Sequence, residues 1–222
     1  MLPRSVIYYA LPGLQEMIAD KIVHECECTR VKNICGIDVS YRDNLAFSTA
    51  VVMNSTKFDV LEMVDSMMPV KFPYIPGFFI LREAGPVLFT MRLLKYDYDV
   101  LLLDGHGMLH PRKCGLASFI GVLINKPTIG VAKKLLCGEV MHDYFVKVNG
   151  TICGFMHKNS SNKHVYISVG NRICLGDSIQ LVKQSTRQGE IIPEPLRIAD
   201  LHSKYICRRF FHDLSLKTAK PN

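Results

Sequence analysis

YDVLLLDGHGMLHPRKCGLASFIGVLINKPTIGVAKK, residues 98–134, is the stretch that decides the fold. Its first apolar run, 98–104, ends on Asp104 and is followed by a turn at Gly105 and Gly107, and a second run, 127–132, ends before Lys133. The helical pattern between them, 113–124, makes this a strand, helix, strand unit with parallel strands. Open α/β sheets bind ligands at the carboxyl ends of such strands, so we expect Asp104 and Lys133 to face one crevice.

The chain before this segment predicts a helix and an antiparallel sheet. Apolar residues at helical spacing predict an amphipathic helix over 11–26, with a stripe of Leu14, Met17, Ile18, Ile22 and Val23. Three apolar runs joined by polar turns predict a meander of antiparallel strands at 33–41, 46–53 and 60–70. The apolar segment 78–94 has helical spacing, but Gly85-Pro86 either kinks the helix or begins it.

The chain after this segment predicts short strands followed by helices. The strand patterns cover 144–148, 151–156 and 165–169, and the helical patterns cover 177–184 and 196–211. The expected fold class is therefore α/β, a mixed central sheet of three antiparallel strands and then parallel strands, flanked by helices. With 222 residues and 48% hydrophobic composition, the chain is expected to form a single domain over 1–222.

Charge and cysteine content indicate the partner and the compartment. The formal net charge of +7 favours an anionic partner, most commonly nucleic acid. The eight cysteines include no CxxC pair and several lie in apolar runs, which favours reduced thiols and a cytoplasmic location, with zinc bound through Cys26 and Cys28 as an alternative. No signal peptide or membrane span is recognised, and a soluble monomer is expected.

Three acids in apolar surroundings predict a metal site. Asp38 lies in the middle of an apolar strand, Glu83 in an apolar helical segment, and Asp104 at a strand end. A buried carboxylate needs a cation or a proton, and a structural ion pair is the alternative for each acid taken alone. Three such acids favour one shared hard cation, Mg²⁺ or Mn²⁺. Their order along the chain is typical of ribonuclease H-like nucleases.

The motifs in this chain resemble those of the endonuclease V family. The matching segments are CGIDVSY (35–41), PYIPGFFILREAGP (73–86), DGHGMLHPRKCGLASFIGVL (104–123), PTIGVAKKLL (127–136) and PEPLRIAD (193–200). The resemblance implies a metal-dependent endonuclease that recognises inosine or deoxyinosine, cuts the second phosphodiester bond 3′ to it, leaves a 3′-hydroxyl and a 5′-phosphate, and initiates DNA repair. The implied cofactor is Mg²⁺, which Mn²⁺ can replace, and the implied substrate is DNA or RNA that contains inosine.

The resemblance also implies roles for individual residues. The metal-binding and catalytic acids would be Asp38, Glu83 and Asp104, and His110 and Lys133 match further catalytic positions. Tyr74 matches the wedge that fills the gap left by the displaced base. The remaining substrate-binding positions are Pro76 in the same loop and the glycines of the base pocket, Gly77, Gly105, Gly107 and Gly130. His106 stands where this family usually has Gln or Asn.

Several of these residues have alternative interpretations. Lys133 can instead be a solvated lysine and Tyr74 a loop anchor. We expect His110 to contact a phosphate or an outer-shell water rather than to pair with His106 on a metal. Asp200 in the last helix either joins the metal site or forms a salt bridge on the helix face, and Glu194 is expected to stabilise the helix dipole. Candidates for phosphate contacts are Arg112, Lys113, Arg172 and Arg197.

Two other functions remain open from the sequence. The acids also suit another ribonuclease H-like nuclease, such as a structure-specific resolvase or a ribonuclease that cuts hybrids. A nucleic-acid-binding protein with structural acids is the alternative outside the enzymes.

Overall fold

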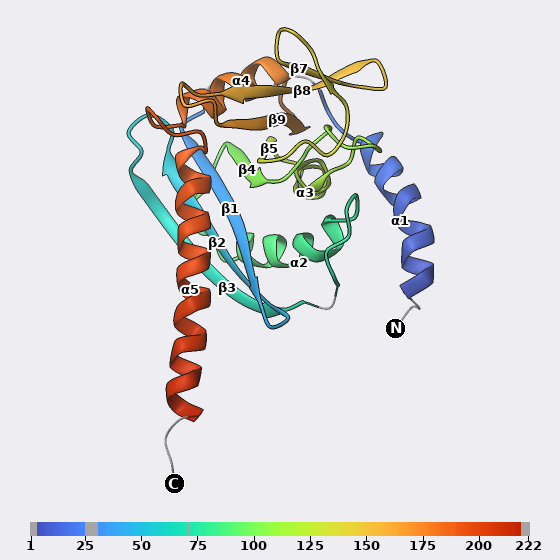
Figure 1. The fold of residues 1–222 in the computed structure, drawn as a ribbon. Helices are drawn as coiled ribbons and strands as arrows, with labels where there is room; N and C mark the ends of the chain where they lie inside the picture. The colour runs from blue at the N-terminus through green and yellow to red at the C-terminus, as the bar shows by residue number, and fades with distance from the viewer. Residues whose placement is uncertain (1–3, 25–30, 71, 219–222) are drawn as a thin grey trace.

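A nine-stranded mixed sheet forms the centre of the computed structural model, which describes residues 4–24, 31–70 and 72–218 (Figure 1). The strand order is β3-β2-β1-β4-β5-β9-β8-β7-β6. The strands are β1 (Asn33–Arg42), β2 (Leu45–Asn54), β3 (Val60–Pro69), β4 (Val100–Asp104), β5 (Thr128–Ala132), β6 (Glu139–Val140), β7 (Phe145–Val148), β8 (Thr151–Lys158) and β9 (His164–Asn171). The expected α/β class and mixed sheet are confirmed.

The strand directions follow the predicted pattern in the first half of the sheet. β1, β2 and β3 form the antiparallel meander, and β1, β4 and β5 lie parallel to one another. Beyond β5, where the sequence predicted strands without a direction, β9 pairs with β5 in the antiparallel direction. The short connections from β7 to β8 and from β8 to β9 allow only antiparallel neighbours.

Helices cover both faces of the sheet (Figure 1). They are α1 (Arg4–Ala19), α2 (Ile80–Met91), α3 (Leu116–Ile124), α4 (Leu175–Gln184) and α5 (Glu194–Thr218). α2 and α3 pack on the face that carries Ile37 and Leu103, whereas α4 and the start of α5 cover the face with Ile34 and Leu102. No helix within the described ranges is both long and apolar enough to cross a membrane.

The N-terminal helix differs from its prediction. α1 ends at Ala19 and does not extend to residue 26. The backbone of Val23 bonds to the end of β9 and the residue after it instead, since its N–H donates to Asn171 Oδ1 and its carbonyl accepts from the Arg172 N–H. The expected stripe was also wrong in part, since Leu14 and Met17 are exposed. The buried row is Leu11, Gln15 and Ile18, one polar residue between two apolar ones. Cys26 and Cys28, the alternative zinc ligands, lie outside the described residues.

The other helices settle the remaining boundaries. α2 begins at Ile80 and contains Pro86 in its interior, so the helix does not begin at Gly85-Pro86. Glu83 therefore lies in the first turn of the helix. α3 begins at Leu116 rather than at 113, since Lys113 adopts a positive φ of 51°. α5 begins two residues before its predicted start and extends to Thr218, and its last turns project beyond the sheet in Figure 1.

A glycine allows α5 to lie close to β1. A Cβ atom on Gly36 would lie 2.4 Å from the carbonyl carbon of Pro195, so any side chain would push the start of α5 away from the strand. Gly36 and Asp38 point to the same face of β1 because side chains alternate along a strand. The close approach therefore brings the first half of α5 against the same face as Asp38.

Candidate active site

Two neighbouring strands carry the first acids of the site. Ile37 of β1 pairs with Leu103 of β4 in the parallel register, so the next residues, Asp38 and Asp104, are also neighbours. Both side chains point to the face that α5 covers. The sequence indicated Asp38 by its position in the middle of an apolar strand and Asp104 by its position at the carboxyl end of one, and the structure agrees with both positions.

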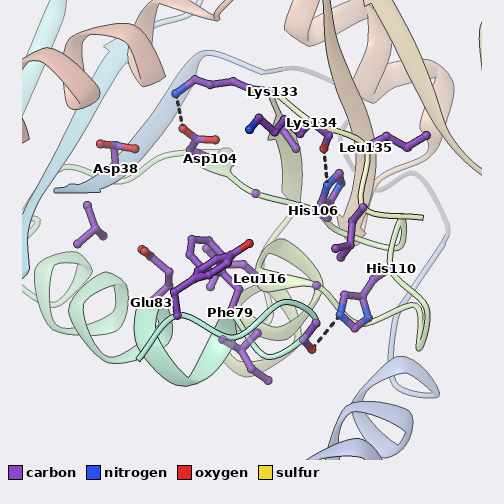
Figure 2. Close-up of a pocket in the computed structure, with 18 of the residues that line it drawn as sticks. Asp38, Phe79, Glu83, Asp104, His106, His110, Leu116, Lys133, Lys134 and Leu135 are labelled. Atoms are coloured by element: carbon purple, nitrogen blue, oxygen red, sulfur yellow. Dashed lines mark hydrogen bonds and ion pairs between the residues drawn. The ribbon is translucent and has the colours of Figure 1, made fainter. Parts of the chain in front are cut away.

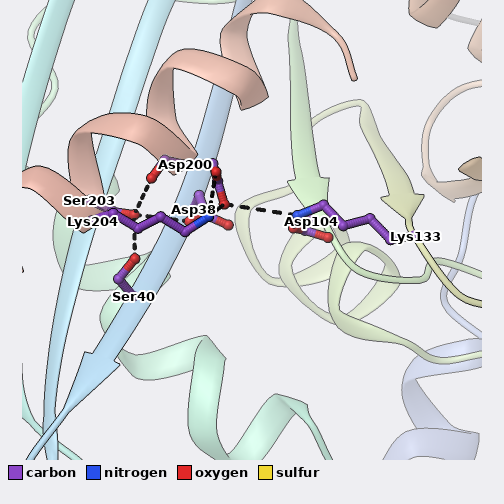
Figure 3. Close-up of polar contacts among 7 residues, drawn as sticks. All are labelled: Asp38, Ser40, Asp104, Lys133, Asp200, Ser203 and Lys204. Atoms are coloured by element: carbon purple, nitrogen blue, oxygen red, sulfur yellow. Dashed lines mark hydrogen bonds and ion pairs between the residues drawn. The ribbon is translucent and has the colours of Figure 1, made fainter. Parts of the chain in front are cut away.

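α5 contributes a third acid to this cluster. One carboxylate oxygen each from Asp38, Asp104 and Asp200 lie within 4.8 Å of one another, a spacing at which three oxygens can hold one metal ion. Asp200 also accepts from Lys204 Nζ at 2.6 and 2.7 Å, which is the salt bridge on the helix face that the sequence offered as the alternative (Figure 3). Its place among the acids is compatible with a metal ligand, and that role stays a prediction. Oxygen-only ligation of this kind suits Mg²⁺ or Mn²⁺ better than a soft metal.

Burial and repulsion between the carboxylates disfavour the charged form of Asp38. Burial, together with the nearby charges of Asp104 and Asp200, raises the pKa of Asp38 to about 6 against the opposing effect of the hydrogen bond from Ser203. The Ser203 hydroxyl donates to Asp38 Oδ2 at 3.0 Å and so fixes the direction of that carboxylate. A bound divalent cation would favour the charged form of carboxylates crowded in this way.

Glu83 approaches the same site from the opposite face of the sheet. It lies on α2, below the ends of β1 and β4, which is why it does not belong to the compact cluster of aspartates (Figure 2). Burial raises its pKa to about 8, while its hydrogen bond with Tyr41 acts in the opposite direction. The charges of Asp38 and Asp104 raise it as well, so Glu83 senses both aspartates.

Lys133 provides positive charge beside the acids, as the strand pattern predicted. Its Nζ donates to Asp104 Oδ2 at 2.7 Å (Figure 2) and lies 3.9 Å from Asp200 Oδ1 (Figure 3). Burial lowers its pKa, but the charges of Asp104, Asp200 and Asp38 outweigh burial and the net pKa is raised. The ammonium is therefore charged at neutral pH.

A pocket of about 500 Å³ opens next to the acids (Figure 2). Asp38, Glu83 and Asp104 line one side of it, and Phe79 and Leu116 provide an apolar wall. The other predicted residues that line it are Tyr74, Gly77, Gly105, His106, His110 and Lys133. A flat apolar wall with polar groups at one end suits a heterocyclic base.

Three predicted substrate-binding residues do not line this pocket. Pro76, Gly107 and Gly130 are absent from its lining among the residues that the structure describes. A Cβ on Gly107 would lie 2.0 Å from the Val169 carbonyl oxygen, and one on Gly130 would lie 2.5 Å from the Gly105 carbonyl oxygen. These two glycines are therefore needed for backbone packing behind the pocket rather than for contact with a base.

The loop that carries Tyr74 is held by one carbonyl. The Gly77 carbonyl oxygen accepts from Arg112 Nη2 at 2.8 Å, from His110 Nε2 at 3.1 Å and from Gln15 Nε2 at 3.3 Å. We call Gln15, His110 and Arg112 the loop clasp. Gly77 has φ +77°, a conformation that glycine adopts without strain. The clasp therefore fixes the peptide at the rim of the pocket.

His110 has a different environment from the one expected. It is buried, and both ring nitrogens have partners, since Nδ1 accepts from the Arg112 backbone N–H at 3.2 Å. Burial and the Arg112 charge lower its pKa to about 4, so the ring is neutral at pH 7 with its proton on Nε2. The geometry therefore gives His110 a place in the loop clasp, and the expected contact with a phosphate or water finds no free ring nitrogen.

Tyr74 is exposed at the tip of the loop. Its side chain is 60% exposed and packs edge-on against Phe79, with ring centroids 5.6 Å apart. A ring supported on one side and open on the other can stack against a base. This exposure favours the wedge over the alternative of a loop anchor, and the wedge role stays a prediction.

The predicted phosphate-binding arginines have other partners. Arg112 belongs to the loop clasp, Arg197 forms a bidentate pair with Glu194 at 2.7 and 2.8 Å, and Arg172 donates to Asn125 at 2.9 Å. Each of these three guanidinium groups therefore contacts another residue of the protein, and a contact with phosphate stays a prediction. Glu194 begins α5 as expected, but it also accepts from Arg187.

The sequence analysis missed two residues that support the site. Gln15 could have been found from its spacing, because it lies four residues after Leu11 and three before Ile18 on the buried side of α1. Ser203 lies three residues after Asp200, hence on the same side of α5, but nothing in its local sequence indicates a contact with Asp38. His106 donates from Nε2 to the Lys134 carbonyl at 2.9 Å, and its Nδ1 is buried without a protein partner.

Comparisons with known proteins agree with this geometry. Residues 16–201 match the family model for endonuclease V. Endonuclease V of Thermofilum pendens is 40% identical over 80% of this chain and 79% of its own length, and that of Pyrococcus abyssi is 40% identical over 86% and 88%.

Solved structures show the same architecture. The catalytic domain of human endonuclease V superposes with a TM-score of 0.84 at 27% identity, covering 95% of this chain and 99% of the human one. Endonuclease V of Ciona intestinalis, solved with a 24mer DNA containing an inosine followed by a ribo-adenosine, gives a TM-score of 0.81 at 26% identity over 94% of this chain and 100% of its own.

The mixed sheet with neighbouring acids on β1 and β4 defines a ribonuclease H-like nuclease, an enzyme that hydrolyses phosphodiester bonds. Within that class the match extends over most of the sequence and includes the elements that carry Asp38, Glu83 and Asp104. The chain belongs to the endonuclease V family.

Proposed function

We propose that this protein is a divalent-metal-dependent endonuclease that recognises inosine in nucleic acid and hydrolyses the second phosphodiester bond on its 3′ side. The observation that carries the proposal is the position of the Asp38, Asp104 and Asp200 cluster at the open edge of a pocket sized for a base. In DNA, where deoxyinosine arises by deamination of adenine, such a cut would initiate repair.

The chain offers a ligand set that fits Mg²⁺, with Mn²⁺ as a substitute. Asp38, Asp104 and Asp200 would hold the ion. Glu83, which is close enough to feel the charges of Asp38 and Asp104, would add a further carboxylate from the other face of the sheet. A divalent ion in such a site activates a water molecule and neutralises charge on the phosphate. Lys133, charged and 2.7 Å from Asp104, adds a fixed positive charge for the negative charge that grows on the leaving oxygen.

The pocket and its loop would handle the base. The loop clasp presents the Gly77 peptide at the pocket rim, and Gly105 lies opposite with no side chain to block a base. Phe79 and Leu116 would stack on the heterocycle, and Tyr74 would fill the gap that the displaced base leaves. His110, neutral and fully hydrogen-bonded, would position the loop.

Cleavage of end-labelled strands tests this proposal. One DNA strand and one RNA strand, each with a single inosine, are incubated with Mg²⁺ and separately with EDTA, and products are sized at nucleotide resolution. The proposal expects a metal-dependent cut at the second bond 3′ to inosine, and the preferred strand tells whether the substrate is DNA or RNA. Unmodified and branched strands are the controls.

Other results would contradict it. Equal cutting with and without inosine would indicate a structure-specific nuclease of the same fold, and cutting that persists in EDTA would remove the metal from the proposal. Binding of nucleic acid with no hydrolysis under any metal would favour a binding protein with structural acids.

A further inference from the structure

A second hollow, of about 400 Å³, lies between the carboxyl-terminal half of β1 and α5. We call it the α5 groove. Asp38, Val39 and Asp104 line both the α5 groove and the base pocket, so the two hollows meet at the acids. Away from the acids the base pocket is lined by α2 and the loop at Tyr74, whereas the groove continues along α5 to Arg208.

One row of side chains on α5 leads along this groove. Asp200, Lys204 and Arg208 are spaced four residues apart, hence on one side of the helix, and all three line the groove. Ser203 and Cys207, the residues next to them, are buried against the sheet. The row therefore runs along the border between helix and sheet, with an acid at the cluster and then two cations.

The two cations differ in their contacts. Lys204 donates to both oxygens of Asp200 and stays close to the acids (Figure 3). Arg208 is exposed and lies about 6 Å further along the helix axis than Lys204, at the end of the groove row away from Asp200. Arg208 lies outside residues 16–201 that match the family model.

We propose that the α5 groove holds the backbone of the substrate strand on the 3′ side of the cleaved bond, with Arg208 against one of its phosphates. The inference rests on the proposed function: when the base occupies the pocket and the bond cut lies 3′ to it, the strand passes the acids and continues away from the pocket. Besides the base pocket, two hollows are lined by both Asp104 and Asp200, and the α5 groove, with about 400 Å³ against about 60 Å³ for the other, is the one with room for a strand. Phosphate contacts of this kind position the strand without reading its sequence.

Shortened substrates test the inference. Arg208→Gln is compared with Arg209→Gln, the adjacent exposed arginine, which contacts Tyr205 and Asp213 and does not line the groove. Each is assayed on an inosine strand with a long 3′ arm and on one that ends at the nucleotide after the cut. For Arg208→Gln we expect KM on the long strand to rise by about 3- to 10-fold, and the salt dependence of binding to fall by about one phosphate contact.

The pattern across substrates decides the outcome. On the short strand Arg208→Gln should match the wild type, and Arg209→Gln should match it on both strands. An equal loss on both strands, no loss on either, or a loss that follows the length of the 5′ arm would overturn the inference. Lys204 is not used for this test because it contacts Asp200.

Binding separates this inference from the proposed function. Anisotropy of labelled strands in EDTA gives the same comparison of 3′ arms without any cleavage. If the wild type failed to cut inosine strands, the proposed function would fail, while the dependence of binding on Arg208 and the 3′ arm would still be measured. If the wild type cut as proposed and Arg208→Gln showed no dependence on the arm, the groove assignment alone would fail.

Discussion

Arg112 Nε donates to Gln15 Oε1 over 2.7 Å, which joins the loop before α3 to the N-terminal helix. The same Gln15 side chain donates to the Cys114 carbonyl at 2.9 Å and to Gly77 at 3.3 Å. A fully buried amide with all three contacts satisfied locks α1, the loop before α3 and the loop with Tyr74 to one another. The position of the pocket rim therefore depends on α1.

Gln15→Leu should loosen this connection. It leaves Arg112 Nε and the Cys114 carbonyl without these partners, so we expect the free energy of unfolding to fall by about 1 to 3 kcal/mol. Because Gly77 also loses a donor, KM for an inosine strand should rise more than kcat falls. Denaturant unfolding and steady-state kinetics measure the two effects. Glu16→Gln, at the exposed next position, should change neither, and an unchanged KM in Gln15→Leu would contradict the role of the clasp.

Asp104→Asn should separate metal binding from folding. The variant removes one negative charge from a crowded cluster, so we expect it to fold with the wild-type circular dichroism spectrum. Cleavage should fall below about 1% of wild type because the ion loses a charged ligand. In thermal melts, saturating Mg²⁺, about 100 times Kd, should stabilise the wild type by about 2.7 kcal/mol and the variant far less. Retained cleavage would refute the assignment of the acids, and the same test applies to Asp38.

Tyr74→Ala should discriminate between duplex and single-stranded substrates. A wedge is needed only where a base leaves a stack, and loss of stacking costs about 1 to 3 kcal/mol, or roughly 5- to 150-fold. We therefore expect cleavage of inosine in a duplex to fall by such a factor and cleavage in a single strand to fall much less. Tyr74→Phe, which keeps the flat ring against Phe79, is the control and should stay close to wild type. Equal losses on both substrates would argue against a wedge.

The Glu194 ion pairs predict a pH dependence of stability. Hydrogen bonds from Arg197 lower the pKa of Glu194 to about 2 from its ordinary value of 4.5, and Arg187 lowers it as well. A depressed pKa means that the ion pairs stabilise the fold fully above pH 4.5 and lose this effect as the pH falls toward 2. Because both arginines are partly exposed, we expect Glu194→Gln to destabilise by about 1 to 2 kcal/mol at pH 7.

Urea unfolding at two pH values measures this effect. The difference between Glu194→Gln and the wild type should shrink when the pH is lowered from 7 to 3. Glu139→Gln, an exposed substitution in β6, should show little difference at either pH. A gap that stays constant down to pH 3 would mean that the Glu194 carboxylate does not act through its charge.

The apolar patterns of the sequence predicted the strands that carry the acids and Lys133. Asp38 and Asp104 each come after apolar residues that the sequence identifies as a buried strand. Once these two strands pair in parallel, the two acids are neighbours. Lys133 follows from the same unit. The direction of β9 against β5 did not follow, because its apolar run has the same pattern in either orientation.

Contacts between distant elements were beyond the sequence. Whether Asp200 joins the acids depends on how α5 crosses β1, and whether Arg112 meets phosphate or Gln15 depends on the packing of α1. The glycines of the turn after β4 looked like pocket residues, yet Gly107 is needed because Val169 lies against it. A missing side chain is compatible with contact to a ligand or to the backbone, and the sequence does not distinguish them.

The close contact between Gly36 and Pro195 has a consequence for ion selectivity. Asp200 lies on the helix that this contact holds against β1. Because Gly36 has no Cβ atom, the helix lies close to the strand, and this keeps the Asp200 carboxylate close to Asp38. Mg²⁺ bonds oxygen at about 2.0 to 2.1 Å and Ca²⁺ at about 2.3 to 2.6 Å, so a wider cluster favours the larger ion. Calorimetric titration of Gly36→Ala with both ions should therefore show affinity shifting from Mg²⁺ toward Ca²⁺. If the titration shows this shift, Gly36, which is not one of the acids, controls the cation preference of the site through the position of α5.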